Sequence, residues 1–143
     1  MIDELIALFE TYGVEKYDEN ISQTEHAVQC ALLAQLNNAS DELVAAELLL
    51  DVGHLLQLQS NNGNADFSHN DLHENLGAKF LSSTFGPQVT QPILFHVQAK
   101  RYLCSAIPSY QTQFSEGSKR SLELQGGPMS TAESAGFLQN EYF

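Results

Sequence analysis

Helix start signals recur along the whole sequence, and this feature limits the fold more than any other. Ser22-Gln-Thr-Glu25 and Ser130-Thr-Ala-Glu133 are capping-box patterns, in which a serine and a glutamate bond the free backbone N–H groups of a new helix. Apolar residues between these signals repeat at helical spacing, and no segment has the alternation and tight turn of a β-hairpin. The sequence therefore predicts an all-α protein of six or seven helices.

The most distinctive of the expected helices begins at Ser40 and continues through the almost unbroken apolar run 43–50. Because that helix would be apolar on every side, we expect it to be central and buried. Residues 59–70 are polar and rich in turn formers, which indicates a loop. The other expected helices are one that ends at Gly13, one opened by each capping box, one capped by Asp71 with Leu72, Leu76 and Phe80 as its apolar stripe, one through 93–97 and a short one over 118–124.

The size and charge of the chain exclude several classes of function. At 143 residues it is expected to form a single domain, 1–143, with a sizeable core. Its net charge of −12 would repel phosphates, so neither nucleic acid nor an anionic membrane surface is an expected partner. The N-terminal segment is acidic, unlike a signal peptide, and no apolar run is long enough to span a membrane. We expect a cytoplasmic protein.

Four of the six basic residues fall in one short segment, as Lys100, Arg101, Lys119 and Arg120. They are either solvated residues with ordinary charge pairing or a local anion site on an acidic protein. The pattern by itself leaves both interpretations open.

The two cysteines, Cys30 and Cys104, lie far apart in the sequence and form no CxxC pattern. Cysteines without such spacing are more often small apolar residues of the core than a disulfide or a pair of metal ligands. We therefore expect both thiols to be buried apolar groups.

One aspartate and several histidines could hold a metal ion. His26, His54, His73 and His96 lie on or near successive expected helices, and Asp51 directly follows three leucines. Imidazole nitrogens and carboxylate oxygens together suit iron, manganese or zinc. A histidine beside an apolar stripe is more often a hydrogen-bonded core residue, and this alternative stays open for each of them. Asp51 is the stronger signal, because a buried carboxylate is costly unless it is paired or bound to metal.

Five segments carry a family resemblance. They are ENISQTEHAVQCA (19–31), AELLLDVGH (46–54), HENLGAKFL (73–81), HVQAKRYL (96–103) and SKRSLELQGGPMS (118–130). In this order they resemble the HD-domain superfamily, and within it the phosphonate-degrading oxygenases with a mixed-valence di-iron site, of the 2-amino-1-hydroxyethylphosphonate oxygenase type. The last two segments are more specific than the general histidine–aspartate pattern, which also describes many phosphohydrolases. The resemblance implies a single HD-type helical bundle.

The resemblance also implies a role for each residue that matches a family motif. His26 and Asp51 would bind a first iron, and Asp51 would bridge to a second iron bound by His73 and His96. The implied reaction is oxidative cleavage of the C–P bond of a small 1-hydroxyphosphonate. His54 and Lys100 would be catalytic and would contact the phosphonate. The other implied substrate contacts are Tyr17, Glu19, Ser118, Ser121 and Gln125.

Two features depart from the family pattern. Leu50 stands where the pattern has a histidine, and leucine offers no lone pair to a metal. The pattern also closes with an aspartate ligand on a C-terminal helix, but no aspartate follows Asp71 and the chain is expected to end before that helix. Glu133 and Glu141 are better explained as a helix cap and a solvated residue. We expect one or two irons, with the second site retained because it keeps two histidines and a carboxylate.

Three hypotheses follow for the function. The chain is an oxygenase of this type impaired by the two departures, a degenerate member that binds a metal or phosphonate without turnover, or an HD phosphohydrolase acting on a phosphate-bearing ligand. Segments 96–103 and 118–130 favour the oxygenase over the phosphohydrolase, and Leu50 favours the degenerate member. Absence of the C-terminal helix should also expose apolar surface, which is tolerated, covered by a second copy in a homodimer, or capped by rearranged C-terminal residues.

Overall fold

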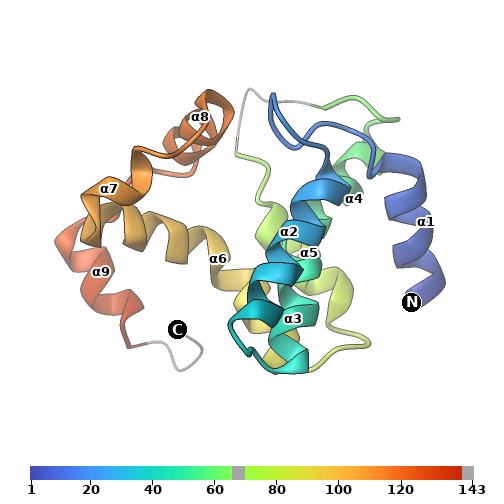
Figure 1. Cartoon of the computed structure of the whole chain (residues 1–143), viewed down its shortest axis with the longest axis horizontal. Helices are drawn as coiled ribbons and strands as arrows, with labels where there is room; N and C mark the ends of the chain where they lie inside the picture. The colour runs from blue at the N-terminus through green and yellow to red at the C-terminus, as the bar shows by residue number, and fades with distance from the viewer. Residues whose placement is uncertain (66–69, 140–143) are drawn as a thin grey trace.

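The chain is built from α-helices throughout the part that the computed structural model describes, residues 1–65 and 70–139 (Figure 1). This confirms the expected all-α class. Residues 66–69 of the expected loop, and Glu141, lie outside the described residues. The helices are α1 (Ile2–Tyr12), α2 (Gln23–Leu36), α3 (Asp41–Leu48), α4 (Val52–Ser60), α5 (His73–Leu81), α6 (Pro87–Ala106), α7 (Pro108–Gln111), α8 (Glu116–Leu124) and α9 (Thr131–Phe137).

The serine caps form as the sequence predicts. Ser22 accepts from the backbone N–H of Glu25, whose carboxylate accepts in return from the N–H of Ser22, and Ser130 with Glu133 repeats this arrangement at α9. Each such cap contributes about 1 kcal/mol to helix stability. Glu133 is therefore a helix-cap residue, as expected.

The prediction of a single helix from Ser40 through the apolar run is wrong. Residues 49–51 form a turn, so that α3 ends at Leu48 and α4 begins at Val52. The expectation that this segment is buried on all sides is also wrong, because Leu48 is 39% exposed whereas Ala46 and Leu49 are buried. This division and the short α7 explain why the described residues form nine helical segments instead of six or seven.

The buried face of α5 differs from the expected stripe of Leu72, Leu76 and Phe80. Leu72 is 49% exposed and Leu76 is 37% exposed. The residues that face the protein interior are His73, Glu74, Gly77, Ala78 and Leu81. Their small members let α5 approach its neighbours closely, since a Cβ on Gly77 would lie 3.2 Å from the side chain of Val52.

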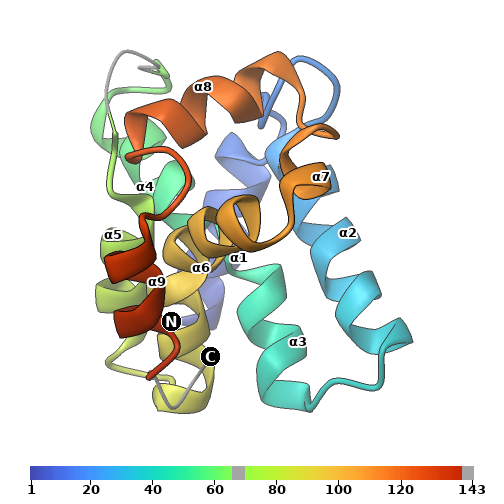
Figure 2. The same ribbon diagram turned by 90° about the vertical axis from the view of Figure 1, so that its left-hand side faces the viewer.

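The core gathers where α1, α3, α4, α5 and α6 meet. Its fully buried members include Val52, Leu55, Leu81 and Ile93. The long helix α6 packs against α3 and α5 and also contacts α7 and α9, so it joins the two groups of helices seen in Figure 1. Figure 2 shows α8 at the top of the view, near the loop that precedes α2.

Apolar side chains remain exposed along α2 and α3. They are Val28, Leu32, Leu33, Leu36, Leu43 and Leu48. Separately, none of the helices in the described part of the chain has the length and apolar character needed to cross a membrane.

The close contact between α4 and α5 generates a test of the fold. A Cβ at Gly53 would overlap the backbone of His73, so Gly53→Ala forces the two helix starts apart. We expect the free energy of unfolding to fall by about 1–3 kcal/mol, the usual cost of overpacking. Urea denaturation followed by circular dichroism measures it.

Gly136→Ala in α9 is the matched control, because nothing lies within 4 Å of the added Cβ. The helix propensity of alanine should leave this variant as stable as the parent or more stable by up to about 1 kcal/mol. Equal stability of the Gly53 variant and the parent would contradict the described approach of α4 to α5.

Candidate metal centre

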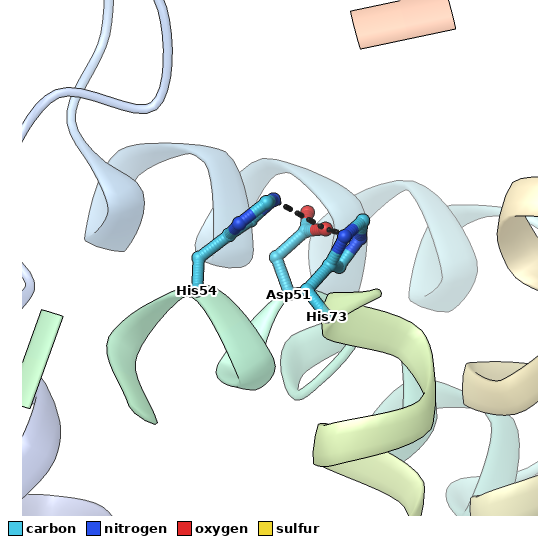
Figure 3. Close-up of side chains that lie close together, drawn as sticks. All are labelled: Asp51, His54 and His73. Carbon is cyan, nitrogen blue, oxygen red and sulfur yellow. Dashed lines mark ion pairs between the residues drawn. The ribbon is translucent and has the colours of Figure 1, made fainter. Parts of the chain in front are cut away.

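The carboxylate of Asp51 is the point where side chains from four helices meet. Its Oδ2 lies 2.9 Å from Nε2 of His26 on α2, and its Oδ1 lies 3.0 Å from Nε2 of His73 on α5. Nε2 of His96 on α6 is 3.4 Å from Oδ1, and Nε2 of His54 on α4 is 3.7 Å from it. The structure thus brings together the five residues that the sequence singled out as chemically active. Figure 3 shows three of them, with Asp51 between His54 and His73.

The turn between α3 and α4 sets the direction of this carboxylate. Asp51 occupies the N-cap position of α4 with a non-helical backbone, yet its side chain makes no capping hydrogen bond. It is turned to the histidines instead. Burial alone would raise the pKa of the Asp51 carboxyl, but hydrogen bonds from His26, His73 and His96 hold that pKa well below its usual range. Asp51 is therefore an ionised carboxylate at the centre of an imidazole cluster.

The outer ring nitrogens of three histidines are held by acceptors. Nδ1 of His96 lies 2.6 Å from the carbonyl oxygen of Ile93. Nδ1 of His73 is 3.0 Å from Oδ1 of Asp71, and Nδ1 of His54 is 2.6 Å from Oδ2 of the same residue. Because each acceptor fixes a proton on Nδ1, we assign to Nε2, which faces Asp51, the position that holds either a second proton or a metal ion. Metal-binding histidines are oriented in this way.

The spacing of the inner nitrogens fits a metal ion. Nε2 of His73 and Nε2 of His96 are 2.9 Å apart. Two nitrogens bound at about 2.1 Å and at right angles on one ion would be separated by about 3.0 Å. Ligand atoms of Asp51, His54 and His73 also all lie within 4.8 Å of one another. Two or three imidazoles with one carboxylate suit a divalent ion such as iron, manganese or zinc.

The same cluster favours positive charge. Burial lowers the pKa of His26, but the hydrogen bond with Asp51 outweighs it and raises that pKa to about 10. Burial also lowers the pKa of His73, but hydrogen bonds with Asp51 and Asp71 outweigh it and raise that pKa to about 9. Protons thus occupy positions that a bound cation would take, because the two aspartates make the centre strongly attractive to cations.

Tyr17 covers the His26 side of the centre. Its ring stacks on the imidazole with 3.7 Å between ring centroids and an interplanar angle of 6°. Burial, with a further contribution from Asp51, raises the pKa of the Tyr17 phenol above its usual value. Leu50 is partly buried and packs against the apolar core, so it adds no donor to this side.

Lys100 lies one helical turn after His96 on α6 and is half-buried. Burial lowers the pKa of its ammonium group, although the nearby carboxylates, first of them Asp51, act in the opposite direction. No ion pair of Lys100 is described in the residues covered by the structure. Arg101 and Lys119 instead pair with Glu133 and Glu116, at 3.0 and 3.4 Å, which supports ordinary charge pairing for these two.

The other expected substrate residues lie on α8 and on the loop before α2. The carboxylate of Glu19 lies against Gly117 at the start of α8. Ser118 takes part in the α8 cap, with its Oγ 3.1 Å from that of Ser115, and Ser121 is exposed. The side-chain oxygen of Gln125 is buried without a hydrogen-bond partner. No described contact joins these α8 residues to the histidines, and their substrate roles stay predictions.

Asp71 is the residue of this centre that sequence reasoning missed. It was expected to cap α5, but the N-cap residue is Leu72, one position later. Oδ1 of Asp71 still accepts from the backbone N–H of His73 at 3.1 Å. Its two oxygens also hold two imidazoles. The only sequence signal was its position two residues before His73, and a cap explained that position fully. Glu74 was missed as well: its Oε2 is buried without a hydrogen-bond partner, 3.5 Å from Nδ1 of His73.

Comparison with known proteins gives the family. No family model matches the chain. It is 43% identical over 141 residues to the hydroxymethylphosphonate dioxygenase of Gimesia maris, covering 99% of this chain and 70% of that protein. It is 36% identical over 141 residues to the [1-hydroxy-2-(trimethylamino)ethyl]phosphonate dioxygenase (glycine-betaine-forming) of Leisingera caerulea, covering 98% and 71%. An uncharacterized protein of Acanthamoeba polyphaga mimivirus is 29% identical over 144 residues, covering 99% and 66%. Identity of this extent, around a centre of histidines and one ionised carboxylate, places the chain in the family of phosphonate dioxygenases.

Proposed function

We propose that this chain binds a small 1-hydroxyphosphonate beside an iron ion and cleaves its C–P bond oxidatively, with an activity reduced by Leu50. The observation that carries the proposal is the convergence of the His54, His73 and His96 Nε2 atoms on ionised Asp51. It occurs in a chain 43% identical to a hydroxymethylphosphonate dioxygenase. The helical bundle around this centre would be of the HD type.

Asp51, His73 and His96 would hold the metal, because their ligand atoms are mutually 2.9–3.4 Å apart. Two histidines and one carboxylate are the ligand type of mononuclear non-haem iron. Such an ion supplies the redox chemistry that oxidation of an unactivated C–H bond requires. The contribution of the protein is to fix ligand orientation, through Asp71 and the carbonyl of Ile93.

Lys100 would bind the phosphonate. Its ammonium group is half-buried on the same helix as His96 and pairs with no described carboxylate, which suits a dianionic ligand. His54 would also contact it, since its ring stacks on that of the metal-binding His73 with 3.9 Å between centroids. Glu19, Ser118 and Gln125 would line the rest of the pocket.

Leu50 favours a second candidate, a family member that binds metal and phosphonate with little turnover. The side chain packs on the core, so His26 and Asp51 are the two family ligands left on that side of the centre. A phosphohydrolase is less well supported, because both named relatives are dioxygenases.

The metal site can be tested with His96→Ala. After anaerobic purification with ferrous iron, the parent chain should retain about one iron or more per chain, and the variant should lose at least tenfold in affinity because one of about three ligands is gone. Elemental analysis measures the content. The exposed neighbour Gln98→Ala should bind as the parent does. Iron binding that is equal in all three proteins would refute the site.

The proposed activity can be tested with Leu50→His. With ferrous iron, O2 and hydroxymethylphosphonate, we expect release of phosphate to rise about tenfold or more, since a restored ligand commonly changes activity by that factor. Leu50→Met, which keeps volume but adds no nitrogen ligand, is the control and should match the parent. If the histidine variant takes up no more iron than the methionine variant, residue 50 does not face the metal.

The substitution Asp71→Asn distinguishes the contributions of His54 and His73, the two histidines that Asp71 contacts. The backbone N–H of His73 should keep the amide oxygen on its side, so the NH2 group faces His54 and shifts the proton of that ring to Nε2. We expect metal affinity to change less than about tenfold, whereas Asp71→Ala, which frees both rings, should lose about 10–100-fold. Competition against a chelator measures both, and equal affinities would argue against the bridging role.

A further inference from the structure

We propose that the thiolate of Cys30 is a metal ligand, completing with His26 and Asp51 the side of the centre that Leu50 leaves without a donor. The inference rests on the proposed metal centre and extends it, because cysteine is not among the ligands expected from the family pattern. It assigns this chain a centre with sulfur on one side of Asp51 and imidazoles on the other.

Helix α2 places Cys30 one turn after His26, on the same face. Sγ of Cys30 lies 3.6 Å from Nε2 of His26, and that same nitrogen lies 2.9 Å from Oδ2 of Asp51. Nε2 of His26 is therefore the atom that both the thiol and the carboxylate approach. The nitrogen points to both other donors, as it would to an ion shared by all three.

The distance between sulfur and nitrogen agrees with two ligands of one ion. A sulfur at about 2.3 Å and a nitrogen at about 2.1 Å, separated by a tetrahedral angle, would be about 3.6 Å apart, which is the separation of Sγ and Nε2. At the same angle a nitrogen and an oxygen at about 2.1 Å would be about 3.4 Å apart, so an ion at this place requires the carboxylate of Asp51 to move away from His26 by about 0.5 Å.

The two cysteines of the chain differ in the way this inference requires. Cys104 is 5% exposed, as expected for a small apolar residue of the core. The same expectation is wrong for Cys30, which is partly exposed and contacts an imidazole. A hydrogen bond between the thiol and His26 would give the same contact, and the Co²⁺ titration described below distinguishes it from a shared metal ion.

Glu47 is the rival donor. It lies one turn before Asp51, and its carboxyl group is close enough to interact electrostatically with His96, Asp51 and His26. However, no contact of Glu47 with these residues is described, whereas Sγ of Cys30 contacts Nε2 of His26. The thiol is therefore the better placed donor, and Glu47→Gln becomes a discriminating control.

Metal binding by Cys30 has a defined chemical balance. The thiol loses its proton to solvent as the S–metal bond forms, and no electron is transferred. A thiolate is a softer donor than imidazole or carboxylate, so it should favour zinc or cobalt over manganese at this position. It also gives a bound Co²⁺ a near-ultraviolet thiolate-to-metal charge-transfer band, which donors of nitrogen and oxygen do not produce.

The experiment is an anaerobic titration of the reduced full chain with Co²⁺, followed by absorption spectroscopy. We expect the charge-transfer band in the parent chain, in Cys104→Ala, in Glu47→Gln and in His96→Ala, which alters the other side. We expect Cys30→Ser and Cys30→Ala to lose the band, and to bind Co²⁺ on the His26 side of Asp51 at least about tenfold more weakly. Circular dichroism confirms that each variant is folded.

The outcomes separate this inference from the proposed function. Co²⁺ bound with ligand-field bands alone, or a band that survives in Cys30→Ala, overturns the role of Cys30 and leaves the metal centre intact. Weaker Co²⁺ binding in Glu47→Gln, together with parent-like binding in Cys30→Ala and no charge-transfer band in the parent chain, assigns the rival. Absence of any Co²⁺ binding overturns the metal centre and this inference together. Alkylation gives an independent readout: Zn²⁺ should protect Cys30 from iodoacetamide, whereas Cys104 should stay unreactive throughout.

Discussion

The ionised carboxylate of Asp51, almost enclosed by protein, is the constraint on which the rest of the structure depends. A buried charge of this kind costs several kcal/mol unless opposite charge or hydrogen bonds surround it. Four helices supply that surrounding through His26, His54, His73 and His96, so the directions of α2, α4, α5 and α6 are tied to one side chain. The turn at 49–51 follows from this, because a continuous helix would leave the backbone of Asp51 with α-helical geometry and direct its carboxylate elsewhere.

A second layer of contacts makes that cluster a candidate metal centre. Imidazoles around a carboxylate could satisfy it through N–H donors alone. Here the Nδ1–H groups of three rings donate instead to Asp71 and to the carbonyl of Ile93. Nε2 of each ring then faces Asp51, where it binds either a second proton or a metal cation. Gly53 makes this geometry attainable, because a side chain there would keep α4 from reaching the backbone of His73. The close packing of the starts of α4 and α5 is thus required for the geometry of the centre.

The sequence predicted local features well and directional ones poorly. The capping boxes at Ser22 and Ser130 were recognised because their whole hydrogen-bond pattern lies within four residues. Asp51 was recognised because a charge after three leucines has few alternatives. The break after Leu48 was missed because leucines favour a continuous helix, and only the distant histidines override them. The face of α5 was misjudged for a related reason: Leu72 precedes the helix in a left-handed conformation, which no apolar spacing reveals.

Residue 50 shows why chemistry is harder to predict than fold. The loss of a histidine there could be read from the sequence, but the response of the site depends on what lies across from it. Cys30 on α2 is separated from Asp51 by the whole of α3 in the sequence, and its relation to His26 exists only through the turn of α2. A sulfur donor opposite the imidazoles would make the two sides of Asp51 unequal in softness and charge. The family reaction would then depend on which ion the sulfur side accepts, and metal supply would decide the activity of this chain as much as its ligand set does.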